Sequence, residues 1–185
     1  KEGRLSFKNL VTFNLDEYVG LPKNHFQSYR NYMKKELFDH IDINQNNAFI
    51  PECFDENFDS ASSNYEANIA KHGGIGLQLL GIGSNGHIGF NEPGSNYDSL
   101  TRLVHLDYLT RNDARKAFVG IEHVPTAAIS MNWPPPDSDS RWLESDPDLQ
   151  NPSKDAKSAK RLKCAALQGG GAHFVSAIEG RCGST

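Results

Sequence analysis

The chain has 185 residues, of which 37% are hydrophobic, and its formal net charge is −4 at pH 7. This length suits one domain with a modest core. The acidic balance gives no electrostatic footprint for nucleic acid or for an anionic membrane surface, so we expect neither as a partner. No apolar run approaches the ~18 residues that a membrane-spanning helix needs.

The first predicted element is a strand over residues 9–15, which are apolar and rich in β-forming residues. It leads directly into Asp16 and Glu17, and then into a turn over 19–22. Acidic side chains at the carboxyl end of a strand often face a ligand in α/β proteins. Such a pair more commonly caps a turn and faces water, and this stretch alone favours that second interpretation.

Two helices are predicted next. Ser28 is a typical N-cap residue, and the helical spacing after it continues to about His40. A polar loop over 42–59 follows. The second predicted helix covers 63–72 and is ended by the glycines at 73–74.

Residues 77–93 are the most informative stretch. The apolar run 77–82 predicts a short buried strand, and the glycines after it permit a tight turn and close approach to a ligand. The turn presents His87 and, five residues later, Glu92. A lone histidine is more often a surface or core residue, and a glycine cluster is more often only a turn. Together, with a carboxylate able to fix the imidazole tautomer, they favour an active-site loop.

The order strand, helix, helix, strand, without a hairpin signal, predicts an α/β fold with a parallel sheet. In such a sheet Asp16 and His87 lie at the carboxyl ends of two strands. We therefore expect them to converge on one pocket.

A polar loop over 94–101 is a candidate lid. Thr110 is then predicted to cap a helix that carries Arg111 and Arg115 on one face. That face is either a solvated basic surface or an anion clamp, since arginine matches phosphate geometry. A further strand is predicted over 125–131.

The composition changes at Asn132 to a stretch rich in Pro, Ser, Asp and Lys. We therefore predict a folded domain over 1–131 and a divergent, largely disordered tail over 132–185. The three cysteines are an odd number at spacings that fit no zinc motif. They indicate a reducing compartment, and we expect the protein in the cytoplasm.

Two motifs, VTFNLDEYVGL at 11–21 and GIGSNGHIGFNEP at 81–93, closely resemble those of the glucosamine-6-phosphate deaminase (glucosamine/galactosamine-6-phosphate isomerase) family. The resemblance runs from about residue 3 to residue 131. It implies a Rossmann-like α/β fold, a parallel sheet with flanking helices, and no metal or nucleotide cofactor. The implied reaction converts glucosamine 6-phosphate and water into fructose 6-phosphate and ammonia.

The resemblance also implies site residues: catalytic Asp16, Asn85, His87 and Glu92, and phosphate-binding Arg115 and Lys163. Asp16 matches the general base, and with a reference pKa of ~3.9 an aspartate is ionised at neutral pH. His87 matches the residue that opens the sugar ring, and Glu92 matches its carboxylate partner. Asn85 stands where many members carry Asp, so we expect it to act by hydrogen bonding. The match of Lys163 to the phosphate lysine is faint.

The family's first strand, helix and phosphate loop precede the matched region and are absent from this chain. We therefore expect a fragment that is weak or inactive by itself, because a sheet that lacks strands exposes an apolar edge. Some members are hexamers, so a homo-oligomer is also an expectation. Two alternatives stay open. One is a 6-phosphogluconolactonase-like enzyme, although the resemblance to that family would imply a Ser-Leu-Phe-Pro sequence where this chain has FNEP at 90–93. The other is an inactive chain that at most binds sugar phosphate.

Overall fold

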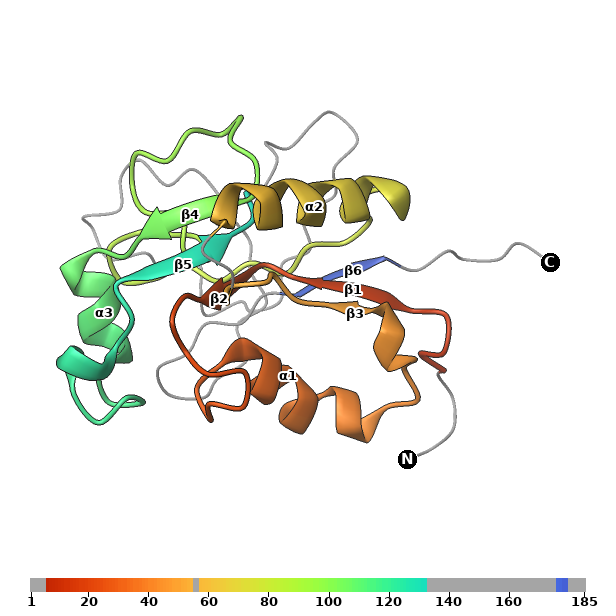
Figure 1. Ribbon diagram of the computed structural model, residues 1–185, viewed down its shortest axis with the longest axis horizontal. Coiled ribbons are helices and arrows are strands. Elements are labelled where there is room, and N and C mark those ends of the chain that lie inside the picture. Colours follow the sequence, from red (N-terminus) through yellow and green to blue (C-terminus); the bar gives the residue numbers. More distant parts are fainter. Residues whose placement is uncertain (1–5, 55–56, 133–175, 180–185) are drawn as a thin grey trace, which may run out of the picture.

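The computed structural model describes residues 6–54 and 57–132, together with the backbone of residues 176–179. Helices flank two short sheets (Figure 1). The strands are β1 (Val11–Asn14), β2 (Asp16–Tyr18), β3 (Ala48–Phe49), β4 (Arg102–His105), β5 (Ala127–Ser130) and β6 (Ser176–Glu179). The helices are α1 (Tyr29–Glu36), α2 (Phe58–Lys71) and α3 (Tyr108–Ala114), with 3-10 turns at Phe38–His40, Gln45–Asn47 and Ile121–His123.

In the first sheet β1 lies between β3 and β6, and in the second β5 lies between β2 and β4. The β1–β3 pair is parallel, as the sequence predicts, whereas the β1–β6, β2–β5 and β4–β5 pairs are antiparallel. Figure 1 shows α1 and α2 on opposite sides of β1 and β3. β6 lies within the predicted tail, and the rest of that tail from residue 133 lies outside the described residues.

The strand predicted over 77–82 does not form. The segment instead folds back onto its own glycine-rich turn, where Ile82 pairs with Ile88 in an isolated antiparallel bridge and the Gly83 N–H donates to the His87 carbonyl at 2.8 Å. Leu80 is buried as predicted, but Leu77 is exposed. The apolar run therefore supplies core contacts, and in the described part of the chain it adds no strand to either sheet.

The predicted helix starts are only partly correct. Ser28 caps α1, since its hydroxyl accepts from the Asn31 N–H at 3.1 Å. α2 begins at Phe58, five residues before the predicted start at 63, because the Asn57 side chain accepts from the Ser60 N–H at 3.0 Å.

The prediction that Thr110 caps the third helix is wrong. The N-cap of α3 is Asp107, whose carboxylate accepts from the Leu109 N–H at 2.8 Å. The helix ends at Ala114, so Thr110 lies within it and Arg115 is its C-terminal cap residue.

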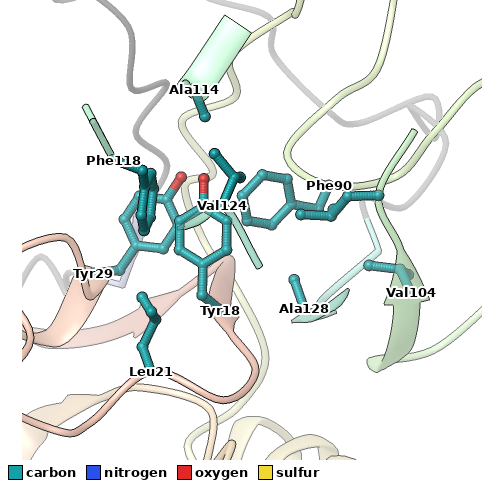
Figure 2. Close-up of a cluster of buried hydrophobic side chains, with 10 residues drawn as sticks. Tyr18, Leu21, Tyr29, Phe90, Val104, Ala114, Phe118, Val124 and Ala128 are labelled. Carbon is teal, nitrogen blue, oxygen red and sulfur yellow. The ribbon is translucent and has the colours of Figure 1, made fainter. Parts of the chain in front are cut away.

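Ten buried residues form the first of three hydrophobic clusters, shown in Figure 2. They are Tyr18, Leu21, Tyr29, Phe90, Val104, Leu106, Ala114, Phe118, Val124 and Ala128. The Tyr18 ring is 5.5 Å from that of Tyr29, in a stacked arrangement, and 4.9 Å from that of Phe90. Because Phe90 belongs to the glycine-rich stretch, this cluster anchors one end of it.

A second cluster anchors the same stretch from another side. It contains Phe13, Leu15, Tyr65, Ile69, Leu80, Ile88 and Met131. Ile88 and Phe90 therefore enter different clusters, and Gly89 lies at the crossing between them. The third cluster packs Met33 and Phe38 against Ile43. None of the described helices has the length and hydrophobicity of a membrane span.

Candidate active site

Asp16 lies at the start of β2 with 5% of its surface exposed, so the water-facing interpretation is wrong. Its carboxylate accepts a hydrogen bond from the Phe90 backbone N–H. A side-chain carbon at Gly89 would come within 2.2 Å of Leu15 Cδ2 and 3.2 Å of Asp16 Oδ2. Gly89 also has a φ of +57°. A glycine is therefore needed here for the loop to approach Asp16.

The surroundings of Asp16 change its acidity. Burial raises the pKa of this carboxyl group well above its usual value, and the nearby Glu17 charge raises it further, while the Phe90 N–H opposes both effects. The ionised base is therefore harder to populate at neutral pH than the reference value indicates. The sequence could not show this, because it depends on how completely the loop covers the carboxylate.

Glu17 is also buried, at 1% exposure, and it holds the start of α1. Its Oε1 accepts from the N–H groups of Tyr18 at 2.9 Å and Tyr29 at 3.0 Å, and its Oε2 accepts from that of Arg30 at 2.9 Å. Burial raises its pKa, and these bonds oppose the rise. The first N–H groups of any helix need partners, which is the signal that could have identified this residue.

His87, Asn85 and Glu92 form a connected set. Glu92 Oε2 accepts from Asn85 Nδ2 at 2.9 Å, and Asn85 Oδ1 accepts from the His87 backbone N–H at 3.0 Å. These two bonds fix the orientation of the amide. Asn85 Oδ1 lies 2.6 Å from His87 Nδ1, so Nδ1 must carry the proton that lies between them. The other ring nitrogen, Nε2, is then an acceptor in the neutral imidazole.

These hydrogen bonds therefore connect Glu92 to His87 through the Asn85 side-chain amide. The sequence predicted a carboxylate holding the imidazole, and the structure places Asn85 between them. Asn85 does act by hydrogen bonding, as its residue type indicates. Glu92 Oε1 meanwhile accepts from the Asp107 N–H at 2.9 Å, which ties the set to the start of α3.

Asn91 fixes the loop to the second sheet, a role that the sequence did not reveal. Its buried amide donates to the carbonyls of Met131 at 2.8 Å and Ile88 at 3.2 Å, and its oxygen accepts from Arg102 at 2.9 Å. Met131 lies just beyond the end of β5, and its N–H donates to the Leu15 carbonyl at 2.7 Å. The loop is thereby held next to the residue that precedes Asp16.

The two arginines predicted on one face of the third helix each have polar partners in the described part of the chain. Arg111 donates to the carbonyls of Ile121 at 3.0 Å and Val124 at 3.3 Å, so it stabilises the turn after α3 rather than presenting a free clamp. Arg115 is exposed, and its guanidinium donates to Asn112 at 3.0 Å. Lys163 lies outside the described residues. Within the described ranges, no three His, Cys, Asp or Glu side chains form a group that could hold a metal ion.

Comparison with known proteins confirms the resemblance, although no protein-family model matches the chain. A glucosamine-6-phosphate deaminase of Halalkalibacterium halodurans is 50% identical over 126 residues, which cover 68% of this chain and 51% of the relative. One of Mycoplasma mycoides subsp. mycoides is 50% identical over 131 residues, covering 71% and 52%. The chain spans about half the length of the curated relatives it matches.

A solved structure is similar as well. It is described as a monomeric glucosamine-6-phosphate deaminase, a missing link of the NagB superfamily. It is 42% identical, with a TM-score of 0.67, over 69% of this chain and 53% of that chain. This similarity confirms the predicted α/β fold.

Proposed function

We propose that this chain, which is homologous to the glucosamine-6-phosphate deaminases over about two thirds of its length, carries the ring-opening and proton-transfer residues of such an enzyme. The reaction converts glucosamine 6-phosphate and water into fructose 6-phosphate and ammonia. One observation supports this most directly: a single loop holds both expected groups. Asp16 accepts from Phe90 beside Gly89, and the His87 ring lies over Gly83.

Ring opening is assigned to His87. With Nδ1–H donated to Asn85, the Nε2 lone pair can accept the proton of the anomeric hydroxyl. Cleavage of the bond between C1 and the ring oxygen then gives the aldehyde, and the proton passes to the released oxygen. Glu92 stabilises the positive charge on the ring through the Asn85 amide.

Proton transfer between carbons is assigned to Asp16. Its carboxylate takes the proton from C2 and returns it at C1, while the amino group gives up one proton and O1 gains one, so that the 2-amino aldose becomes an imine at C2 with a hydroxymethyl group at C1. Water then adds to C2 and ammonia leaves, giving the ketose. Burial favours this step because a desolvated carboxylate with a raised pKa is a stronger base than a free one.

Two further assignments concern the substrate phosphate. Arg115 is proposed to bind the substrate phosphate, which its exposed guanidinium can do as a bidentate donor. Lys163 is proposed as a second phosphate contact. We also propose a cytoplasmic location, supported by the odd number of cysteines, and a homo-oligomer, although the solved relative is described as monomeric. No metal or nucleotide cofactor is assigned.

Residues 90–92 favour this proposal over a lactonase. Phe90 lies in the core, Asn91 fixes the loop to β5, and Glu92 supports Asn85. Each of these contacts depends on a residue type in the FNEP motif.

The test is to incubate the full chain with glucosamine 6-phosphate and to measure ammonia and fructose 6-phosphate. Release of both in equal amounts, lost in Asp16→Asn, supports the proposal. No turnover with retained binding of the sugar phosphate indicates a binding protein. Hydrolysis of 6-phosphogluconolactone instead identifies the alternative enzyme. We expect weak turnover, so a rate in the usual enzyme range of ~1–1,000 per second would contradict that part.

A further inference from the structure

A residue of α3 contacts the His87 side chain, and neither the motifs nor the comparisons assign it a role. Thr110 is buried in the first turn of this helix, and its Oγ1 lies 3.0 Å from His87 Nδ1. The same oxygen accepts from Asn85 Nδ2 at 3.4 Å. The hydroxyl therefore lies within reach of both side chains.

We propose that Thr110 is a positioning residue that holds the His87 imidazole in its catalytic orientation. The catalytic consequence rests on the proposed function, whereas the contact itself does not. Because the Asn85 amide orientation is fixed by Glu92 and by the His87 backbone, His87 Nδ1 is a donor. Thr110 Oγ1 is then a second acceptor for that N–H.

A second acceptor matters here because Asn85 is uncharged. An amide oxygen stabilises the ring N–H less than a carboxylate does. Two acceptors restrict rotation of the ring about χ2 more than one does, so Nε2 keeps a fixed direction for the substrate proton.

The position of Thr110 is itself fixed by the contacts of α3. Glu92 Oε1 accepts from the N–H of Asp107, the N-cap residue, and the Ser84 hydroxyl donates to Asp113 near the end of the helix. Both partners belong to the loop that carries His87. The helix and the loop are thus joined at two places on either side of Thr110.

The test compares Thr110→Val, which removes the hydroxyl, with Thr110→Ser, which keeps it. Thr12→Val is the matched control, because Thr12 is a buried threonine of β1 whose Oγ1 has no hydrogen-bond partner among the residues that the structure describes. Nitrogen-15 NMR of the full chain, with His87 assigned through a His87→Gln variant, reports the Nδ1–H and its exchange with water.

We expect the Nδ1–H to exchange about fivefold to tenfold faster in Thr110→Val, the effect of one lost neutral hydrogen bond, and to be restored in Thr110→Ser. Unchanged exchange in Thr110→Val, or equal changes in Thr12→Val, would overturn the proposal. If the wild-type chain turns over, kcat should fall by a similar factor in Thr110→Val with KM unchanged. If it does not, the proposed function has failed, and the NMR comparison still decides the role of Thr110.

Discussion

The imidazole ring of His87 lies directly over Gly83. A side-chain carbon at Gly83 would come within 1.8 Å of His87 Cε1 and 2.1 Å of Nε2. Gly83 has no positive φ, so its backbone does not require glycine. The space that the ring occupies does require it.

Gly83→Ala should therefore displace the His87 ring and abolish ring opening. Rotation of the ring would also break the 2.6 Å contact with Asn85 Oδ1. We expect at least a ~100-fold loss of kcat/KM, the usual value of a positioned general base. Steady-state ammonia release measures it.

Gly74→Ala is the matched control for that change. Gly74 follows α2 with a φ of +90° and has open space around its Cα, so alanine there strains only the backbone. It should lower stability by about 1 kcal/mol without changing kcat. Equal losses of activity in the two variants would show that general destabilisation, not the ring, is responsible.

Asp16→Asn should abolish activity and stabilise the protein at neutral pH. Because the folded-state pKa of Asp16 is raised, the folded protein binds more protons than the unfolded chain between that value and ~3.9. The contribution of Asp16 to the free energy of unfolding is therefore most favourable below ~3.9 and falls as pH rises through this window. Each pKa unit of the shift costs about 1.4 kcal/mol.

Urea unfolding of both proteins between about pH 4 and pH 8 measures this effect. The difference in the free energy of unfolding between Asp16→Asn and wild type should be largest near pH 8 and should become smaller toward pH 4. An advantage that does not depend on pH would assign the effect to packing rather than to ionisation.

Glu92→Gln should reduce activity by about tenfold. The two oxygens of Glu92 accept from Asn85 Nδ2 and from the Asp107 N–H. A glutamine amide has one acceptor, so one of these donors must lose its partner, at a cost of about 1–3 kcal/mol. The ratio of kcat between Glu92→Gln and wild type measures this loss. Equal kcat values would show that Glu92 has no role in the proposed catalysis.

Val119→Gly should stabilise the protein by about 1 kcal/mol. Val119 follows α3 with a φ of +63° and is 83% exposed, and the next N–H, of Gly120, donates back to the Arg115 carbonyl at 3.0 Å. Glycine removes the strain of a β-branched residue there and forfeits little packing. Thermal unfolding should show a rise in Tm of about 2–4 °C, and Val119→Ala a smaller one. A fall in Tm would refute the strain argument.

Local signals in the sequence predict much of the fold. The Ser28 cap and the strand within 125–131 are present, because each depends on a cap or on an apolar run near in sequence. The prediction of a strand over 77–82 is wrong, because an apolar run of this kind also occurs in a buried segment that folds back on itself, as Ile82 does in pairing with Ile88. Antiparallel pairing of β5 with β2 and β4 is a tertiary choice that no single stretch specifies.

The site follows the same division. The glycine-rich motif identifies His87, Asn85 and Glu92, and the structure brings their side chains together. The contacts of Thr110 and Glu17 depend on how α3 and α1 pack. Their partners are distant in the sequence, so no local pattern predicts these contacts. Arg115 and Lys163 stay predictions.

The alternation of a β-strand gives the two adjacent acids of β2 different partners. Asp16 lies against the glycine-rich loop, while its neighbour Glu17 accepts from the first N–H groups of α1. The register that pairs Asp16 with Ser130 determines which acid faces the loop and which faces the helix. A slip of one position along β5 would exchange the two faces. The proposed base and the residue that holds α1 would then both lose their partners, so a shift in the pairing of this three-residue strand would disturb the proposed site and the helix together.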